Sequence, residues 1–205
     1  LTLVGPGGSG KTRLALEAAA SILSDAKLDS FRHGVFFVSL APLRSVGAIV
    51  PTVAGAIGFS FYAGGEPRLQ LLDYLRQKNM LLIMDNFEHL LACPERGRSI
   101  RSRRDGVDLV TDVLKTAPDV KILATSRARL NVRGEHRFQI VGIECPDWDT
   151  TDDPADSAKR VDSKDWTEYS AVKLFLQGAR RARPDFELAE DDFKYVSRIC
   201  RLVQG

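Results

Sequence analysis

The chain has 205 residues, of which 44% are hydrophobic and 27% charged, and its formal net charge is +2. This is the composition of an ordinary globular protein with one substantial core and room for a second small unit. The near-neutral charge is not that of a nucleic-acid-binding domain, and no apolar run or leader sequence suggests a membrane or secreted protein. Cys93, Cys145 and Cys200 are widely spaced, which indicates reduced thiols and a cytoplasmic location.

The first twelve residues follow the pattern of a phosphate-binding loop. A short apolar strand over 1–4 leads into a glycine-rich loop and then into a helical pattern over 11–24, the context that G-x-x-x-x-G-K-[ST] requires. The glycines allow backbone N–H groups to surround phosphate oxygens, and the helix dipole favours an anion there. Lys11 can reach the β- and γ-phosphates, and the Thr12 hydroxyl can bind Mg²⁺. The candidate nucleotide-binding residues are Gly5, Pro6, Gly7, Gly8, Ser9, Gly10, Lys11, Thr12 and Arg13.

Two other interpretations of this loop remain open. Gly5, Gly7 and Gly10 also satisfy G-x-G-x-x-G, the pattern of dinucleotide-binding proteins. Such a site needs a carboxylate at the end of the second strand, and the residues over 39–42 include none. The other interpretation is a glycine-rich turn that binds no ligand.

Strands and helices are expected to alternate along the next part of the chain. Continuous apolar runs predict buried strands over 34–40 and 80–85. A further short strand is expected over 120–125 and a less regular one over 136–143. Helical spacing predicts helices over 46–57, from Pro67, over 87–91 and over 107–115, with Pro51 either in the first turn of its helix or breaking it. The alternation predicts an α/β fold with a parallel sheet covered on both faces.

The remaining segments divide the chain into three predicted regions. We expect a nucleotide-binding domain over 1–145, a polar linker over 146–166, and the beginning of a helical lid domain over 167–205, which carries two amphipathic helices. Because the chain starts within a strand and stops within a helical pattern, we expect it to be a fragment of a longer polypeptide. The loop over 93–105 carries five arginines and could be a nucleic-acid or partner contact, or simply a solvated loop.

Polar residues at two strand ends provide the candidate catalytic and metal-binding groups. The apolar strand over 81–84 ends in Asp85, which can hold Mg²⁺ together with Thr12 as in a Walker B element, although an aspartate there could also just begin a turn. Arg127 follows the strand over 120–125 and could contact a γ-phosphate, or could be an ordinary surface arginine.

Hydrolysis also needs a group that orients or deprotonates water. Many ATPases carry a carboxylate directly after the Walker B aspartate, where this chain has Asn86. Glu88 is the nearest acidic substitute, and it could equally be a solvated or helix-capping residue. The candidate catalytic residues are therefore Lys11, Asp85, Glu88 and Arg127, and slow hydrolysis at most is expected.

Three motifs together resemble the STAND class of signal-transduction ATPases, and within it the NB-ARC (AP-ATPase-like) module of large bacterial transcriptional regulators. They lie over 5–15, 84–91 and 124–130, and the residues over 134–138, 170–175 and 199–205 fit the same pattern. The resemblance implies a five-stranded parallel sheet in the order 5-1-4-3-2 followed by a helical lid. It also implies an ADP-closed to ATP-open switch that controls self-association and an output domain, often one that binds DNA. Lys11 would then serve the phosphates, Thr12 and Asp85 the Mg²⁺, and Arg127 the sensor role.

The sequence therefore predicts a cytoplasmic module that binds ATP or ADP with Mg²⁺ and acts as a nucleotide switch. Two alternatives are kept. A constitutive ATPase motor or clamp loader would hydrolyse ATP fast, and a degenerate module would hold ADP permanently as part of its structure.

Overall fold

The computed structural model describes residues 1–24, 31–92, 105–145, 167–189 and 192–202. The chain divides into two compact units, of which the first comprises Leu1–Gly5 and Gly10–Ile140 and the second Pro6–Ser9 and Val141–Gly205. The predicted arginine-rich loop and the predicted polar linker lie outside the described residues, apart from the last residue of the loop.

The first unit is built on a five-stranded sheet in the order β2-β3-β4-β1-β5. Every neighbouring pair of strands is parallel. This is the predicted order, so the predicted fold class is confirmed. The strands are β1 (Thr2–Val4), β2 (Val35–Ser39), β3 (Met80–Asp85), β4 (Val120–Ser126) and β5 (Arg137–Gln139).

The strand order also decides between the two ligand-binding interpretations of the glycine-rich loop. In a dinucleotide-binding fold the second strand lies beside the first, in the order 3-2-1-4-5-6. Here β1 lies between β4 and β5, and β2 pairs with β3 instead. The dinucleotide interpretation is therefore wrong on topology, in addition to the missing carboxylate.

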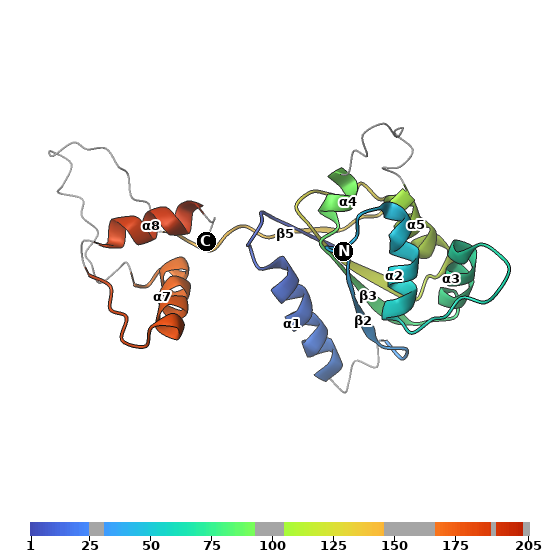
Figure 1. Ribbon diagram of the computed structural model, residues 1–205, viewed down its shortest axis with the longest axis horizontal. Helices are drawn as coiled ribbons and strands as arrows, with labels where there is room; N and C mark the ends of the chain where they lie inside the picture. Colours follow the sequence, from blue (N-terminus) through green and yellow to red (C-terminus); the bar gives the residue numbers. More distant parts are fainter. Residues whose placement is uncertain (25–30, 93–104, 146–166, 190–191, 203–205) are drawn as a thin grey trace. The chain divides into compact units, whose positions relative to one another are not determined.

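Successive side chains of the central strand point to opposite faces of the sheet, as the two-residue period of a strand requires. Leu81 and Ile83 pack with helix α1 (Lys11–Ser24) on one face. Leu82 and Met84 belong to the larger core on the other face, beneath α2 (Ile49–Ala56), α3 (Pro67–Leu75) and α5 (Asp105–Thr116) (Figure 1). Both faces are thus covered, which explains why β3 is apolar from Met80 to Met84 and buried throughout.

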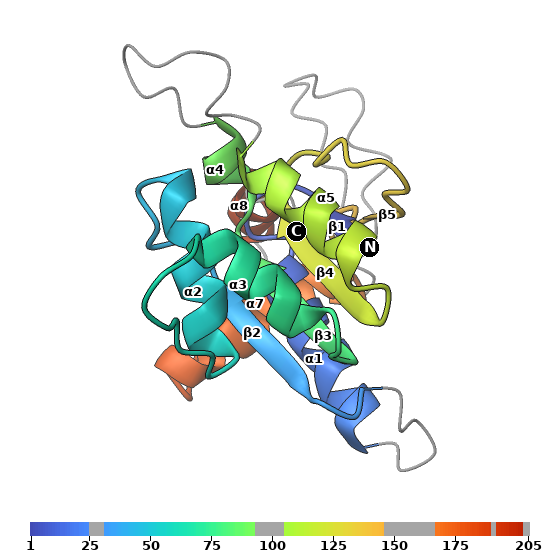
Figure 2. The same cartoon turned by 90° about the vertical axis from the view of Figure 1, so that its right-hand side faces the viewer.

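The predicted helices are confirmed with small shifts at their ends. Pro51 lies in the first turn of α2, where its missing N–H is not needed, and a short 3-10 helix, η1 (Val46–Ala48), leads into it. A five-residue helix, α4 (Glu88–Ala92), follows β3. Strand β5 is shorter than the run predicted over 136–143, and its residues are exposed. Figure 2 shows α2, α3 and α5 lying over the sheet.

The second unit contains two amphipathic helices, α7 (Ser170–Ala182) and α8 (Phe193–Leu202). They share a small apolar cluster around Ala171, Val196 and Cys200, against which Cys145 and Phe175 pack. In the described parts of the chain, no helix is both long enough and apolar enough to cross a membrane.

Candidate functional site

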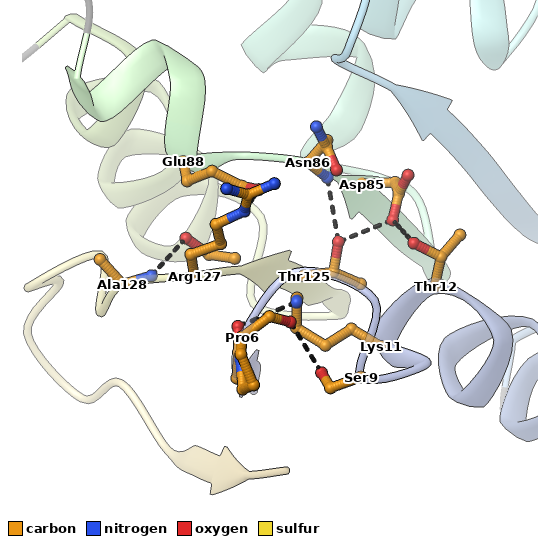
Figure 3. A network of polar contacts seen from close by, with 12 residues as sticks. Pro6, Ser9, Lys11, Thr12, Asp85, Asn86, Glu88, Thr125, Arg127 and Ala128 are labelled. Carbon is orange, nitrogen blue, oxygen red and sulfur yellow. Dashed lines mark hydrogen bonds and ion pairs between the residues drawn. The ribbon is translucent and has the colours of Figure 1, made fainter. Parts of the chain in front are cut away.

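A buried carboxylate at the end of β3 organises the candidate site. Oδ1 of Asp85 accepts hydrogen bonds from the hydroxyl groups of Thr12 and Thr125, each at 2.6 Å (Figure 3). Asp85 is 8% exposed and Thr125 is buried. One oxygen atom therefore joins the first turn of α1 to the ends of two neighbouring strands.

The parallel sheet explains why residues so distant in sequence meet here. Met84 pairs with Ala124 between β3 and β4, and Leu3 pairs with Thr125 between β1 and β4. The carboxyl ends of these three strands therefore lie at one edge, where ligands bind in open α/β sheets. The loop that follows β1 returns the chain to this edge as the start of α1.

Lys11 lies at the same edge and is only 8% exposed. Its Nζ donates a hydrogen bond to the carbonyl oxygen of Gly5 at 2.9 Å. Desolvation by burial lowers the pKa of Lys11, opposed by the nearby charges of Glu88 and Asp85 and assisted by that of Arg127. An ammonium group held in this way is poised for an anion, because a bound negative charge would compensate the lost hydration.

The glycine-rich loop contains a tight turn of its own. The backbone N–H and the hydroxyl of Ser9 both donate to the carbonyl oxygen of Pro6, at 3.4 and 2.9 Å. Gly8 and Gly10 have φ angles of 84° and 80°, a left-handed conformation that side chains other than glycine rarely adopt. This explains why glycine is needed at both positions.

Asn86, directly after the buried carboxylate, also has a left-handed backbone, with a φ of 66°. Its N–H donates to the Thr125 hydroxyl at 2.9 Å, and the N–H of Phe87 donates to the Thr125 carbonyl at 2.9 Å. Phe87 itself is fully buried in the larger core. The turn after β3 is thus tied to β4 by two hydrogen bonds on one threonine.

The remaining charged candidates form an ion pair. Nε of Arg127, just after β4, lies 3.2 Å from Oε1 of Glu88, the first residue of α4. The side chains differ in exposure, with 65% for Arg127 and 17% for Glu88. In Figure 3 both project from the same sheet edge that carries Asp85 and Thr125.

The structure thus brings together, within its first unit, the predicted Lys11, Thr12, Asp85, Glu88 and Arg127. Arg13, predicted as a nucleotide-binding residue, is exposed on the first turn of α1. Sequence reasoning missed Thr125 as a partner of Asp85. The sequence places Thr125 and Ser126 at the end of a predicted strand, but no local pattern identifies Asp85 as the partner of Thr125.

The donor set fits a magnesium–nucleotide ligand. Carboxylate and hydroxyl oxygens are the protein ligands that Mg²⁺ accepts, and Asp85 and Thr12 provide one of each at 2.6 Å separation. The nearly buried ammonium of Lys11 and the exposed guanidinium of Arg127 are cations of the kind that hold phosphate. The arrangement can therefore bind a polyphosphate with a divalent cation at the edge of the sheet.

Comparison with known proteins gives relatives that are larger than this chain. No protein-family model matches. The chain is 32% identical over 206 residues to a Mycobacterium tuberculosis protein named "Putative HTH-type transcriptional regulator", and the match covers the whole chain but 19% of that protein. It is 27% identical to a Mycobacterium tuberculosis protein named "Uncharacterized protein", again over the whole chain and over 42% of the relative. The chain thus spans about a fifth of the regulator.

Two solved structures show a lower similarity. The Aeropyrum pernix ORC2 protein in its ADP form is 17% identical, with a TM-score of 0.49 over 68% of this chain and 41% of that one. CDC6P from Pyrobaculum aerophilum is also 17% identical, with a TM-score of 0.46 over 69% of this chain and 38% of that one.

Proposed function

We propose that this chain is the nucleotide-binding switch module of a larger regulator and that it binds ATP and ADP with Mg²⁺. The observation that carries the proposal is the hydrogen bond between Thr12 and Asp85 at 2.6 Å. It places the last residue of the phosphate-loop motif against a carboxylate 73 residues away in sequence. Two motifs that were identified separately therefore form one donor set.

Each group has a defined task in this proposal. The Lys11 ammonium binds phosphate oxygens, and Thr12 and Asp85 hold the metal ion. Bound Mg²⁺ would neutralise phosphate charge and fix the orientation of the phosphate chain. Arg127 contacts the terminal phosphate, which ATP has and ADP lacks, so its environment differs between the two bound states. Such a difference is what a switch requires.

We further propose that the module belongs to the STAND class and that hydrolysis is slow. The three-motif resemblance and the similarity to a protein named as a transcriptional regulator support this assignment. Slow turnover is supported by Asn86, an amide in the position that carries a catalytic carboxylate in many ATPases. In this proposal nucleotide exchange controls self-association of the full-length protein and a DNA-binding output domain beyond this chain.

The binding proposal is tested by the Lys11→Ala variant. Isothermal titration calorimetry with ATP and with ADP, each with Mg²⁺, should show binding to the wild type and none to the variant, because the buried cation of the loop is lost. Lys121→Ala is a matched control, since Lys121 is an exposed lysine that donates to the Pro118 carbonyl at 2.8 Å. Wild-type affinity in Lys11→Ala would contradict the site assignment.

Turnover separates the switch from its alternatives. Fast basal hydrolysis that is lost in Glu88→Gln would favour a motor. ADP that remains bound through purification and does not exchange with ATP would favour a module in which ADP is a permanent structural ligand.

A further inference from the structure

The ion pair between Glu88 and Arg127 is unusual in where its two members lie. The guanidinium is largely in solvent, with 65% of the side chain exposed, whereas the carboxylate is mostly enclosed, with 17% exposed. Such a pair contributes little to stability, because the exposed partner is screened and its side chain loses conformational freedom. Stability alone therefore does not explain why a carboxylate stands at position 88.

The two carboxylate oxygens of Glu88 have different environments. Oε2 of Glu88 is buried, and within the described residues it has no hydrogen-bond partner. A buried polar atom left without a partner loses its hydration without compensation, and the penalty is larger when the atom is charged. Oε1 faces the exposed guanidinium of Arg127, so the carboxylate keeps one oxygen paired and the other buried without a hydrogen bond.

Glu88 also lies within electrostatic reach of Lys11. Its negative charge is the largest influence that opposes the lowered pKa of Lys11, while Arg127 acts in the opposite direction. The Glu88 carboxylate thus interacts electrostatically with two cations, Arg127 and the phosphate-loop residue Lys11. Glu135, another carboxylate of the loop after β4, accepts from the N–H groups of Leu130 and Asn131 at 3.0 and 2.9 Å, so its two oxygens are already engaged.

We propose that Glu88 is a positioning residue that binds Arg127 in competition with the terminal phosphate of ATP, and that it thereby sets the preference of the site between ATP and ADP. This inference rests on the proposed function. When a terminal phosphate is present, Arg127 exchanges one anion for another. When it is absent, Glu88 keeps Arg127 paired. The carboxylate lowers ATP affinity and makes the response of Arg127 depend on which nucleotide is bound.

This role differs from that of a residue that orients water. A water-orienting glutamate affects turnover and leaves the ratio of ATP to ADP affinity unchanged. A competing glutamate affects that ratio, and it acts only through Arg127. Binding measurements can therefore distinguish the two roles without any measurement of hydrolysis.

The experiment measures the dissociation constants of ATP and ADP, with Mg²⁺, for wild type and Glu88→Gln by isothermal titration calorimetry. Exposed ion pairs contribute about 0.2–1 kcal/mol, which corresponds to roughly a 1.4- to fivefold change in affinity. Glu88→Gln should therefore increase the preference for ATP over ADP by about that factor. The affinities for both nucleotides should rise when the negative charge near Lys11 is removed. The ratio of ATP affinity to ADP affinity is therefore the quantity to compare.

Repeating the substitution in an Arg127→Gln background isolates the pair. If Glu88 acts through Arg127, the shift in the ratio disappears in that background. A shift of the same size there would indicate general charge repulsion and would overturn the proposal. Asp73→Asn is the control for charge, because Asp73 pairs with Arg76 on α3 at 3.7 Å with both side chains exposed, and it should leave the ratio unchanged.

The remaining outcomes are also decisive. An unchanged ratio in Glu88→Gln, with hydrolysis lost, would overturn the proposal and assign Glu88 to water. If Glu88→Gln fails to fold by circular dichroism, Glu88→Asp, which withdraws the carboxylate by one methylene, should shift the ratio in the same direction, and an unchanged ratio would again overturn the proposal. A wild type that binds neither nucleotide would instead refute the proposed function itself.

Discussion

At the scale of single residues, Thr125 determines the direction of the hydrogen bonds around Asp85. Its hydroxyl oxygen accepts from the Asn86 N–H at 2.9 Å, so its own proton is free to go to Asp85 at 2.6 Å. Short bonds of this kind to a carboxylate are about twice as strong as neutral ones. Two hydroxyl groups thus donate to one oxygen of the buried Asp85 side chain.

Replacing Thr125 by valine should therefore destabilise the protein by about 1–3 kcal/mol, because Asp85 loses a donor and the Asn86 N–H loses its acceptor. Urea denaturation would measure the change. Thr111→Val is the matched control, since the Thr111 hydroxyl donates to a carbonyl of its own helix, that of Val107 at 2.9 Å, and its replacement should cost clearly less. Equal losses in the two variants would contradict the role of Thr125.

The lowered pKa of Lys11 predicts a pH dependence of stability. The unfolded chain holds this proton up to the ordinary value of 10.5, whereas the folded protein releases it at lower pH. Stability then rises with pH between the two values, because the unfolded state binds more protons there. Relative to Lys11→Met, the wild type should gain stability as the pH approaches 10.5. Chemical denaturation at several pH values would measure this difference, and a parallel profile for the two proteins would contradict it.

At the scale of elements, Gln70 of α3 holds the loop that precedes its helix. Its amide nitrogen donates to the carbonyls of Tyr62 and Gly64 at 3.2 and 2.8 Å, and its oxygen accepts from the Tyr62 N–H at 3.1 Å. The residue is buried. The loop therefore satisfies several of its backbone groups with one side chain instead of with water or a strand partner.

Gln70→Leu should cost about 1–3 kcal/mol and should increase hydrogen exchange over 60–66, because the Tyr62 N–H loses its acceptor and the loop carbonyls lose the donor that holds the loop in place. Gln77→Leu, at an exposed position just after α3, is the control and should change neither quantity appreciably. Unchanged exchange over 60–66 in Gln70→Leu would show that the loop does not depend on this side chain.

The contrast between these elements shows what the sequence could predict. Strands β2, β3 and β4 follow from apolar runs, and α1 from its glycine-rich entry, because these are local patterns. A strand that is buried on both faces has a continuous apolar sequence, and this run can be recognised locally. The hydrogen-bond partners of Thr125 and Gln70 could not be predicted from a local pattern. These partners lie outside the strand or helix that carries each residue, so they depend on the tertiary structure. Strand β5 was overestimated in length because its exposed edge lacks a periodic pattern.

The candidate site was predicted to the extent that its residues stand at strand ends. Lys11, Thr12, Asp85 and Arg127 could be placed at one edge from the alternation of strands and helices alone. The pairing of Glu88 with Arg127 was not predicted, because it depends on how α4 leaves the sheet. Their roles toward a nucleotide remain predictions for the variants described above.

At the scale of the whole molecule, Phe87 links the candidate site to the stability of the first unit. Its backbone follows Asp85 and Asn86, and its ring is fully buried in the larger core, close to Gly106 at the start of α5. The site is therefore anchored on the larger of the two apolar clusters that flank the sheet. A change in that core should weaken the fold as a whole.

Phe87→Ala should lower the free energy of unfolding by about 3–5 kcal/mol, a large share of the 5–15 kcal/mol typical of a domain, because it leaves a cavity in a close-packed core. Phe138→Ala is the matched control on β5, where the ring is exposed, and should cost less than about 1 kcal/mol. Thermal unfolding would compare them, and similar losses would contradict the central place of Phe87.

The left-handed backbone at Asn86 limits how this sheet edge can diversify. Asparagine, aspartate and glycine adopt such a conformation readily, whereas other side chains do so at a cost of roughly 1–2 kcal/mol. Of the two acidic residues, only aspartate fits there without that cost. The backbone conformation at position 86 therefore restricts which acidic residue can stand there. Asn86→Asp is the substitution that would introduce a carboxylate without backbone strain.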